Sequence, residues 1–373
     1  MSNKNTKYWV GFNIIPGIGR VRFGQLEKYF GDLGAAWKAG PAELKQAGLD
    51  ASPIRAIKNW RPRISLEAEM EKLNRFGIKV LTWHDPKYPA RLKEIYDYPP
   101  LLYIRGSLLP EDEWCLAVVG TRRPTVYGRQ VTEEIVTELA RSKITIVSGL
   151  AKGIDAIGHR SALEVGGRSI AVFAGGLDSV YPAENASLAR SIIKQGALLS
   201  EHHPGTRPRP ENFPRRNRIL SGLSLGVLVV EAGESSGALI TAHLALEQNR
   251  EVFAIPGSIL SAVSRGTNHL IQEGAKLVRD YSDILEELNL TAVARQIEMK
   301  EIIPSSDTET LLLKKLGAEP THIDEVCRLS GLPVSEVSST LAMMELKGLV
   351  KQVGTMNYTL AREAREKYRV EID

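Results

Sequence analysis

The 373-residue sequence predicts an α/β protein built on a Rossmann-like, doubly wound and mostly parallel sheet. Short apolar runs such as residues 144–147 alternate with amphipathic segments such as residues 130–141, as expected when parallel strands are buried on both faces. Glycine-rich loops follow several of these runs, and ligands of such sheets bind outside the carboxyl ends of the strands. We therefore place an extended Rossmann-like domain at residues 76–288.

The strands of this domain are predicted one by one from short β-branched or apolar runs. They are expected at residues 78–83, 101–105, 116–119, 144–147, 169–173, 197–200, 227–231 and 252–255. The intervening amphipathic segments supply the helices that cover the two faces of the sheet.

Residues 1–75 are predicted to form short helices interrupted by a glycine turn at residues 16–19. This pattern is similar to a helix-hairpin-helix or SAM-like unit. Its glycines either present N–H groups to a DNA phosphate or simply form a structural turn, and the short signal favours the structural turn.

The C-terminal part of the chain is predicted to be a winged-helix domain at residues 306–373, reached through a linker at residues 289–305. Its helices are expected at residues 310–316, 321–329 and 333–347, with Thr321 capping the second. A two-stranded wing at residues 350–360 completes the pattern.

The bulk composition excludes several classes of protein. The net charge of +4 is small, so an anionic partner must be recognised by a local patch rather than by the whole surface. Cys115 and Cys327 are far apart and form no metal or redox motif, which fits a reducing cytoplasm. The polar N-terminus shows no signal peptide, and no apolar run is long enough to span a membrane. We expect a cytoplasmic protein without metal or cofactor.

The loop that begins at Ser148 is the strongest chemical signal. It reads S-G-L-A-K-G and joins a predicted strand to a predicted helix, so its backbone N–H groups can point at an anion near the helix N-terminus. Gly149 and Gly153 permit the tight turn, and Lys152 adds a positive charge. This loop predicts phosphate binding.

Asp155 and His159 follow in the same predicted helix, four residues apart. They form either an acid–base pair or a structural pair, in which the aspartate caps the helix and the histidine bonds a loop carbonyl. We favour the structural role. No Walker A sequence and no G-x-G-x-x-G fingerprint is present, which argues against ATP hydrolysis and NAD chemistry.

The second strong feature is the segment of residues 205–218, which carries five arginines against the single acid Glu211. Its three prolines predict an extended segment, and Phe213 offers a ring. Arginine and an aromatic ring together suit a single strand, since charge meets the backbone and the ring stacks on a base. A solvated charge run is the alternative. We favour binding because Arg216 and Arg218 are expected near the same rim as the glycine loops.

These motifs together resemble the DNA processing protein A (DprA/Smf) family over most of residues 80–270. The resemblance rests on residues 88–92, 99–106, 118–122, 127–128, 148–159, 213 with 216–218, 235–237 with 241, and 255–257. It implies an extended Rossmann fold that binds single-stranded DNA, forms a homodimer, and loads the RecA recombinase during natural transformation, without being an enzyme.

The resemblance also implies a set of DNA-binding residues. These are Arg122, Ser148, Gly149, Lys152, Gly153, Arg216 and Arg218. Phe213 is added by its position and chemistry, and the expected DNA-binding set also includes Gly120, Asn217, Ser236 and Gly237. Asp155 and His159 are expected to be structural members of the site.

Two other functions remain open at this point. The fold also resembles lysine-decarboxylase-like phosphoribohydrolases, but no acid stands at the matching position of the loop at residues 234–241. A regulator that reads duplex DNA would need basic residues on the helix at 333–347, which offers none before Lys347. We therefore expect the winged helix to be a protein-contact or weak accessory module.

Overall fold

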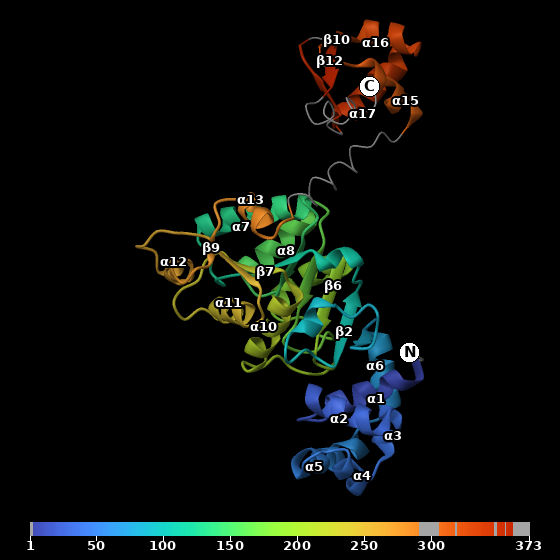
Figure 1. Cartoon of the computed structure of the whole chain (residues 1–373), viewed down its shortest axis with the longest axis vertical. Coiled ribbons are helices and arrows are strands. Elements are labelled where there is room, and N and C mark those ends of the chain that lie inside the picture. Colours follow the sequence, from blue (N-terminus) through green and yellow to red (C-terminus); the bar gives the residue numbers. More distant parts are fainter. Residues whose placement is uncertain (1–2, 291–305, 318, 347–348, 355, 361–373) are drawn as a thin grey trace. The chain divides into compact units, whose positions relative to one another are not determined.

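The computed structural model describes residues 3–290, 306–317, 319–346, 349–354 and 356–360. The chain divides into two compact units, Met1–Asn289 and Leu290–Asp373 (Figure 1). Almost all of the predicted linker lies outside the described residues, and so do residues 361–373 of the predicted winged-helix domain.

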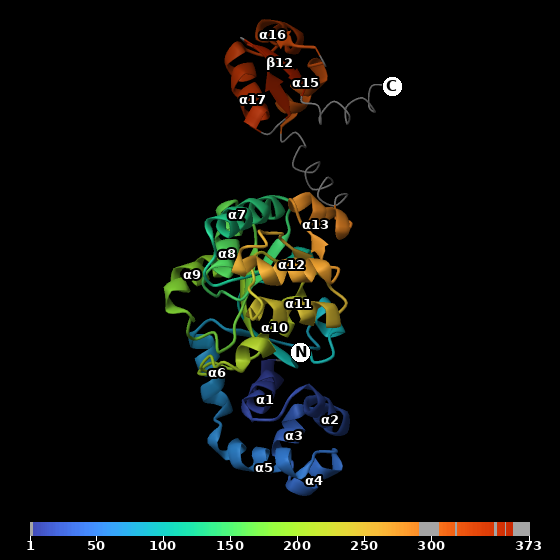
Figure 2. The same cartoon turned by 90° about the vertical axis from the view of Figure 1, so that its left-hand side faces the viewer.

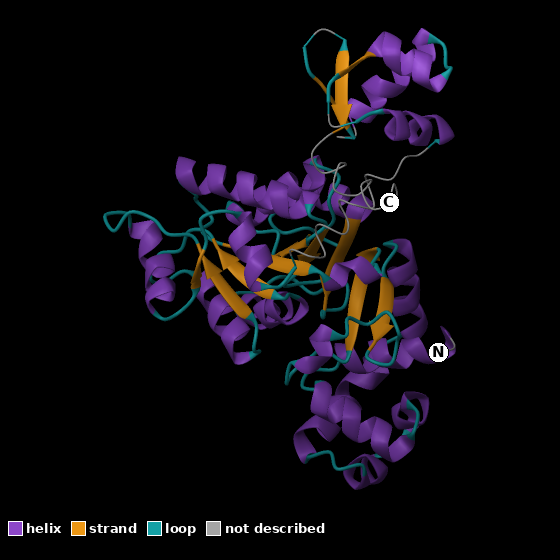
Figure 3. Ribbon diagram, turned by 45° about the horizontal axis from the view of Figure 1, so that its top comes forward, coloured by secondary structure: helices purple, strands orange, loops and turns teal. Residues whose placement is uncertain are grey.

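The first unit is built on a nine-stranded sheet in the order β1-β2-β6-β5-β4-β3-β7-β8-β9 (Figure 3). The strands are β1 Lys79–Thr82, β2 Leu101–Gly106, β3 Cys115–Val119, β4 Thr145–Ser148, β5 Ser169–Val172, β6 Gly196–Ser200, β7 Gly226–Val229, β8 Glu251–Ala254 and β9 Lys276–Leu277. Strands β1 and β2 are antiparallel to their neighbours, and the other pairings are parallel. The predicted fold class is confirmed.

All eight predicted strands are present, and β9 was missed. This strand has only two residues, both exposed, so it carries no apolar run that a sequence pattern can detect.

Helices cover both faces of the sheet (Figure 2). They are α7 Val126–Arg141, α8 Ile154–Glu164, α9 Ala186–Gln195, α10 Asn212–Leu223, α11 Gly237–Glu247, α12 Arg265–Gln272 and α13 Tyr281–Glu287. Residues of α8 and α9 belong to one hydrophobic core, and residues of α10, α11 and α12 belong to the core on the other face. Successive residues of β2, such as Tyr103 and Ile104, point into different cores because side chains alternate along a strand.

The N-terminal helices share a core with the sheet. They are α1 Asn3–Ile14, α2 Arg20–Phe30, α3 Leu33–Lys38, α4 Pro41–Gln46, α5 Ala51–Trp60 and α6 Leu66–Arg75. Trp9, Phe12 and Phe23 are buried in the same cluster as Leu101 and Tyr103 of β2. The helical region and the sheet therefore form one compact unit.

The second unit is a winged helix with helices α15 Asp307–Lys315, α16 Ile323–Ser330 and α17 Val334–Leu346 and strands β10 Thr321–His322, β11 Val350–Gln352 and β12 Asn357–Leu360. Thr321 does not cap α16, because it pairs with Tyr358 in the sheet. His322 is the cap instead, and its Nδ1 accepts a hydrogen bond from the N–H of Asp324 at 3.3 Å.

Candidate nucleic-acid interface

A groove of about 510 Å³ opens at β3, where the strand order reverses: β4 and β5 lie on one side of β3, and β7 and β8 lie on the other. Strand β3 lies between β4 and β7, so the loops that follow β3 and β7 diverge to opposite faces and leave a crevice at their carboxyl ends. We call this the rim groove. Its walls are Val119, Gly120, Thr121, Arg122, Arg123, Ala151, Asp155, Phe213, Arg216, Asn217, Leu220, Gly233, Ser235, Ser236, Gly237, Ala238, Thr241 and Val263.

The loop after β3 is fixed by the buried carboxylate of Glu231. This carboxylate accepts hydrogen bonds from the N–H and the hydroxyl of Thr125, while the backbone carbonyl of Glu231 accepts from the N–H of Thr121 at 2.7 Å. A Cβ at Gly128 would lie 2.3 Å from the Glu231 carboxylate, so α7 approaches the loop only with glycine there. The position of Arg122 therefore depends on a carboxylate outside the groove wall.

The loop after β4 is held by Asp155. Its Oδ2 accepts hydrogen bonds from the N–H groups of Gly149 at 3.0 Å and Ala151 at 3.3 Å. Burial raises the pKa of the Asp155 carboxyl above its ordinary value, although the nearby Arg216 opposes this shift. Gly153 has a φ of +77°, and a Cβ there would lie 2.3 Å from the carbonyl oxygen of Thr121. Asp155 thus fastens the loop rather than the end of α8.

Arg216 lies at the back of the groove and is 5% exposed. Its Nη1 donates to the carbonyl oxygens of Gly149 and Val172, and its Nε donates to Oδ1 of Asn217 at 3.1 Å. Burial lowers the pKa of Arg216 to about 10, so the guanidinium stays charged at neutral pH. Among the described residues no hydrogen bond uses its Nη2, and no carboxylate forms an ion pair with it. A positive charge is therefore available to an anion in the groove.

Phe213 stands beside the exposed Arg122 at the groove. The guanidinium carbon of Arg122 lies 5.8 Å from the centre of the Phe213 ring. The centres of the Tyr181 and Phe213 rings are 6.0 Å apart. A ring next to an exposed arginine offers a stacking surface and a charge at one place.

A helix N-terminus also faces the groove. Helix α11 begins at Gly237, and Ser236 caps it by accepting a hydrogen bond from the N–H of Ala238 at 3.3 Å. These three residues line the groove, so the positive end of the α11 dipole lies at its wall.

The structure brings eight of the predicted residues together in the groove wall. They are Gly120, Arg122, Asp155, Phe213, Arg216, Asn217, Ser236 and Gly237. The segment that supplies three of them is not extended as predicted, because α10 begins at Asn212. Pro214 falls in the first turn of this helix, where a missing N–H costs no hydrogen bond.

Four predicted residues stand behind or beside the groove. Ser148 is fully buried and donates to the carbonyl of Val118 at 2.6 Å. Gly149 packs against the Arg216 guanidinium, and Gly153 shapes the loop. Lys152 is about half exposed and forms an ion pair of 2.6 Å with Glu184.

His159 of α8 is fully buried and does not form the expected hydrogen bond with a loop carbonyl. Its Nδ1 lies 2.6 Å from the hydroxyl of Ser169. Burial, together with the charge of Arg216, lowers the pKa of His159 to about 3, so the ring is neutral at physiological pH.

Arg218 is the one predicted contact that lies away from the rim. Its Nε pairs with Asp97 at 2.8 Å and its Nη2 with Glu201 at 2.5 Å, and these residues line a different cavity. Two helix positions separate Arg218 from Arg216, which turns their side chains to different sides of α10.

Sequence reasoning missed several groove residues. Arg123, Ser235 and Thr241 line the wall, and Glu231 fixes the loop from behind. All four lie in or next to the glycine-rich loops at the strand ends. Position at the carboxyl edge was the signal that the sequence offered for Arg123 and Glu231, and Ser235 and Thr241 also belong to a motif that carries the family resemblance.

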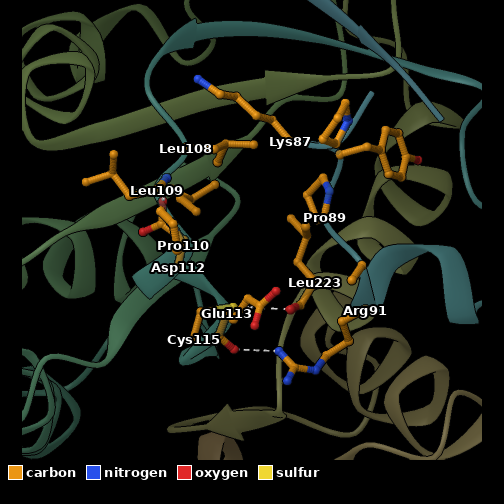
Figure 4. A pocket seen from close by; sticks show the side chains of 14 residues that line it. Lys87, Pro89, Arg91, Leu108, Leu109, Pro110, Asp112, Glu113, Cys115 and Leu223 are labelled. Carbon is orange, nitrogen blue, oxygen red and sulfur yellow. Dashed lines mark hydrogen bonds between the residues drawn. The ribbon is translucent and has the colours of Figure 1, made fainter. Parts of the chain in front are cut away.

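A second cavity of about 320 Å³ lies at the opposite edge of the sheet (Figure 4). Cys115, the first residue of β3, lines it, whereas the rim groove begins at Val119, the last residue of β3. Figure 4 shows Arg91 donating to the carbonyl of Glu113 at 2.6 Å and the Cys115 thiol donating to the carbonyl of Leu223. Arg91 and Cys115 are therefore both hydrogen-bonded to backbone carbonyls in this cavity.

Within the residues that the structure describes, no three His, Cys, Asp or Glu side chains come together to hold a metal ion. None of the helices there has the length and apolar character required to cross a membrane.

Comparison with known proteins identifies the same two regions. Residues 79–289 match the family model of DNA recombination-mediator protein A, and residues 299–354 match that of the DprA winged helix domain. Protein Smf of Synechocystis is 36% identical over 96% of this chain and 99% of its own length. DNA processing protein DprA of Bacillus subtilis is 43% identical over 68% of this chain and 88% of its own length.

Two solved structures are also similar. The X-ray structure of DNA processing protein A from Streptococcus pneumoniae has a TM-score of 0.66 and 37% identity, covering 75% of this chain and 97% of that chain. DNA processing protein A from Helicobacter pylori, described for its single-stranded DNA binding mode, has a TM-score of 0.51 and 31% identity, covering 56% and 95%. The chain studied here therefore belongs to the DNA recombination-mediator protein A family.

Proposed function

We propose that this protein binds single-stranded DNA in the rim groove and acts as a non-catalytic recombination mediator. The observation that carries the proposal is the buried Arg216, whose charge has no ion-pair partner among the described residues and whose Nη2 makes no hydrogen bond there. A buried cation at the back of a groove that also holds the N-terminus of α11 suits a phosphodiester backbone.

The groove also provides for bases without reading their identity. Phe213 offers a flat ring, and base stacking on such a ring contributes about 1–3 kcal/mol per base without sequence preference. Arg122, which lies beside Phe213, contacts the phosphate backbone of the DNA. Binding is therefore expected to be sequence-tolerant and to weaken steeply with salt.

The groove chemistry gives little support to hydrolysis. Asp155 is the only carboxylate in the described groove wall, and backbone N–H groups already occupy it. A phosphoribohydrolase needs an acid that is free to act on the sugar. We expect no release of base from AMP-like nucleotides.

Loading of RecA and homodimer formation belong to the same proposal. They are supported by membership of the family rather than by a surface of this chain. Strand exchange by RecA on DNA coated with single-strand-binding protein, and the mass of the protein by light scattering, are the measurements that test them.

The test of DNA binding compares Arg122→Ala with wild type by fluorescence anisotropy of oligo-dT. We expect about tenfold weaker binding and a salt slope lower by about 0.7, because one phosphate contact is lost. Lys28→Ala, which removes one exposed positive charge from α2, is the matched control and should bind like wild type.

Three results would count against this assignment. They are equal affinity of Arg122→Ala and wild type at moderate salt, tighter binding to duplex than to oligo-dT, and release of base from AMP.

A further inference from the structure

Helix α10 has two functional faces. Phe213, Arg216, Asn217 and Leu220 line the rim groove, whereas Arg215 and Arg218 line a separate cavity. Successive residues turn by about 100° around a helix, so these two sets point in nearly opposite directions. The helix is thus a common wall between the rim groove and the second site.

The separate cavity has a volume of about 400 Å³ and lies where the N-terminal helices meet the sheet. We call it the hairpin cavity, after the glycine turn that leads into α2. Its lining residues come from α1, that turn, the segments next to β2 and β6, and α10. They are Asn13, Ile18, Gly19, Arg20, Asp97, Tyr98, Pro99, Pro100, Glu201, His202, His203, Arg215 and Arg218.

The charges of the hairpin cavity leave an excess of positive charge. Arg218 pairs with both Asp97 and Glu201, so three arginines face two carboxylates and one net positive charge remains. Arg20 and Arg215 have no ion-pair partner among the described residues. Burial lowers the pKa of His202, so that this ring is neutral at physiological pH and leaves the excess to the two arginines.

Four buried polar atoms in the walls of this cavity have no hydrogen-bond partner within the described part of the chain. They are Nε of Arg20, Nη1 of Arg218, Nε2 of His202 and Oε1 of Glu201. A buried charged group without a partner is costly, so the two guanidinium nitrogens call for an acceptor, whereas the carboxylate oxygen of Glu201 calls for a donor. Two of the four are guanidinium donors, which favours an acceptor that is negatively charged.

The geometry of α2 adds N–H donors at the same place. The helix has eleven residues and begins at Arg20, and its N-cap, Gly19, provides no capping side chain. The Arg20 guanidinium carbon lies 4.2 Å from the centre of the Tyr98 ring, which holds the side chain in position. Free helix N–H groups beside an arginine are a common way of binding an anion.

We propose that the hairpin cavity binds a phosphate group, held by Arg20, Arg215 and the N-terminus of α2. The phosphate belongs either to a DNA strand that continues past α10 from the rim groove or to a free nucleotide or inorganic phosphate. The DNA source rests on the proposed function, whereas the free source does not.

The DNA arm of the test uses two lengths of oligo-dT with the full chain. An oligonucleotide of about six nucleotides suffices for the rim groove, and one of about twenty extends beyond it. Arg20→Ala should leave the affinity for the short strand unchanged and weaken the long strand by about three- to tenfold, with a salt slope lower by about 0.7. Lys28→Ala, which removes the same charge from the other end of α2, should change neither.

The free-phosphate arm uses inorganic phosphate and dTMP as probes, followed by calorimetry or by ³¹P line broadening. Loss of binding in Arg20→Ala but not in Lys28→Ala assigns the site to a free phosphate. Arg215→Ala is the second variant, because Arg215 is exposed and its removal does not disturb the core. Arg215→Ala should show the same loss of phosphate and long-strand binding, and it replaces Arg20→Ala as the test if that variant does not fold.

The outcomes separate this proposal from the proposed function. If wild type binds no oligo-dT at all, the proposed function fails while the free-phosphate arm still decides the hairpin cavity. If Arg20→Ala weakens short and long strands equally, the DNA source is wrong. If Arg20→Ala and Arg215→Ala match Lys28→Ala in both arms, the hairpin cavity binds no phosphate and the proposal is wrong.

Discussion

Two arginines stand at opposite ends of β5, and only one of them is neutralised by a carboxylate. Arg168 precedes the first residue of β5 and pairs with Asp112 at 2.8 Å, and this hydrogen bond raises its pKa. Arg216 donates to the carbonyl of Val172, the last residue of β5, and burial lowers its pKa to about 10. Its nearest opposite charge, Asp155, is occupied by backbone N–H groups.

The difference explains what each edge of the sheet can do. The charge of Arg168 is neutralised within the protein by Asp112. The Asp112 carboxylate also accepts a hydrogen bond from the hydroxyl of Thr145 at 2.9 Å. The charge of Arg216 is held in place by carbonyl oxygens, which fix its position without cancelling it. One arginine therefore stabilises the fold, and the other is prepared for an anion from outside.

The largest expected effects come from removing each charge in turn. Arg168→Met should lower the free energy of unfolding by about 3 kcal/mol, because the buried Asp112 carboxylate loses its cation. Its affinity for oligo-dT should stay within about twofold of wild type. Arg216→Met should weaken oligo-dT binding by about 10- to 100-fold, since a charge-assisted contact contributes about 1.5–3 kcal/mol.

Urea unfolding measures the stability of both variants, and anisotropy titrations measure their affinity for oligo-dT. The contrast between the two arginines breaks down if folded Arg168→Met loses as much DNA affinity as Arg216→Met. Arg216→Met is also expected to lose about 1–3 kcal/mol of stability, because two buried carbonyls lose their donor.

A smaller effect concerns the pH dependence of stability near Arg216. The unfolded chain protonates His159 below about 6.5, whereas the folded chain keeps it neutral down to about 3. Stability from this residue is therefore complete above about 6.5 and is lost as pH falls toward 3, by up to about 1.4 kcal/mol per pH unit. His159→Gln should flatten the pH profile of the unfolding midpoint in that window.

The raised pKa of Asp155 acts in the opposite sense. Its contribution is present below its ordinary value and is lost as pH rises through the folded value, so His159→Gln leaves that component in place. Lys28→Ala, which removes only an exposed charge from α2, should retain the steep profile of wild type between pH 3 and 6.5. A profile that is unchanged by His159→Gln would show that the ring is not buried in its neutral form.

The smallest expected effect comes from removing the winged helix. Without residues 306–373, oligo-dT affinity should stay within about threefold of wild type, because the rim groove lies wholly within Met1–Asn289. A large loss would assign DNA contacts to the winged helix. It would then contradict the view that the free charge of Arg216 dominates binding.

Local sequence signals predicted most of the fold and about half of the geometry of the site. The apolar runs located eight strands, and the glycine loops located the carboxyl edge, because buried parallel strands and their turns leave strong local patterns. The segment before Arg216 was misjudged as extended, since a proline in the first turn of a helix looks the same in sequence as one in a loop.

The remaining differences are tertiary. Nothing local distinguishes Arg216, which faces the rim groove, from Arg218, which faces the hairpin cavity, until the helix between the two sites is known. The burial of Ser148 and the carboxylate clamp by Glu231 likewise depend on neighbours far away in the chain.

The glycine at position 149 has a consequence for how this site can vary. A Cβ there would lie 2.3 Å from Nη2 of Arg216 and 2.6 Å from its Cζ, so even one methyl group occupies the space of the guanidinium. Gly149→Ala would leave Arg216 in the sequence but displace its guanidinium from the observed position. Position 149 therefore limits the space for the guanidinium of Arg216. A homologue with a side chain at this position would have to place that arginine differently.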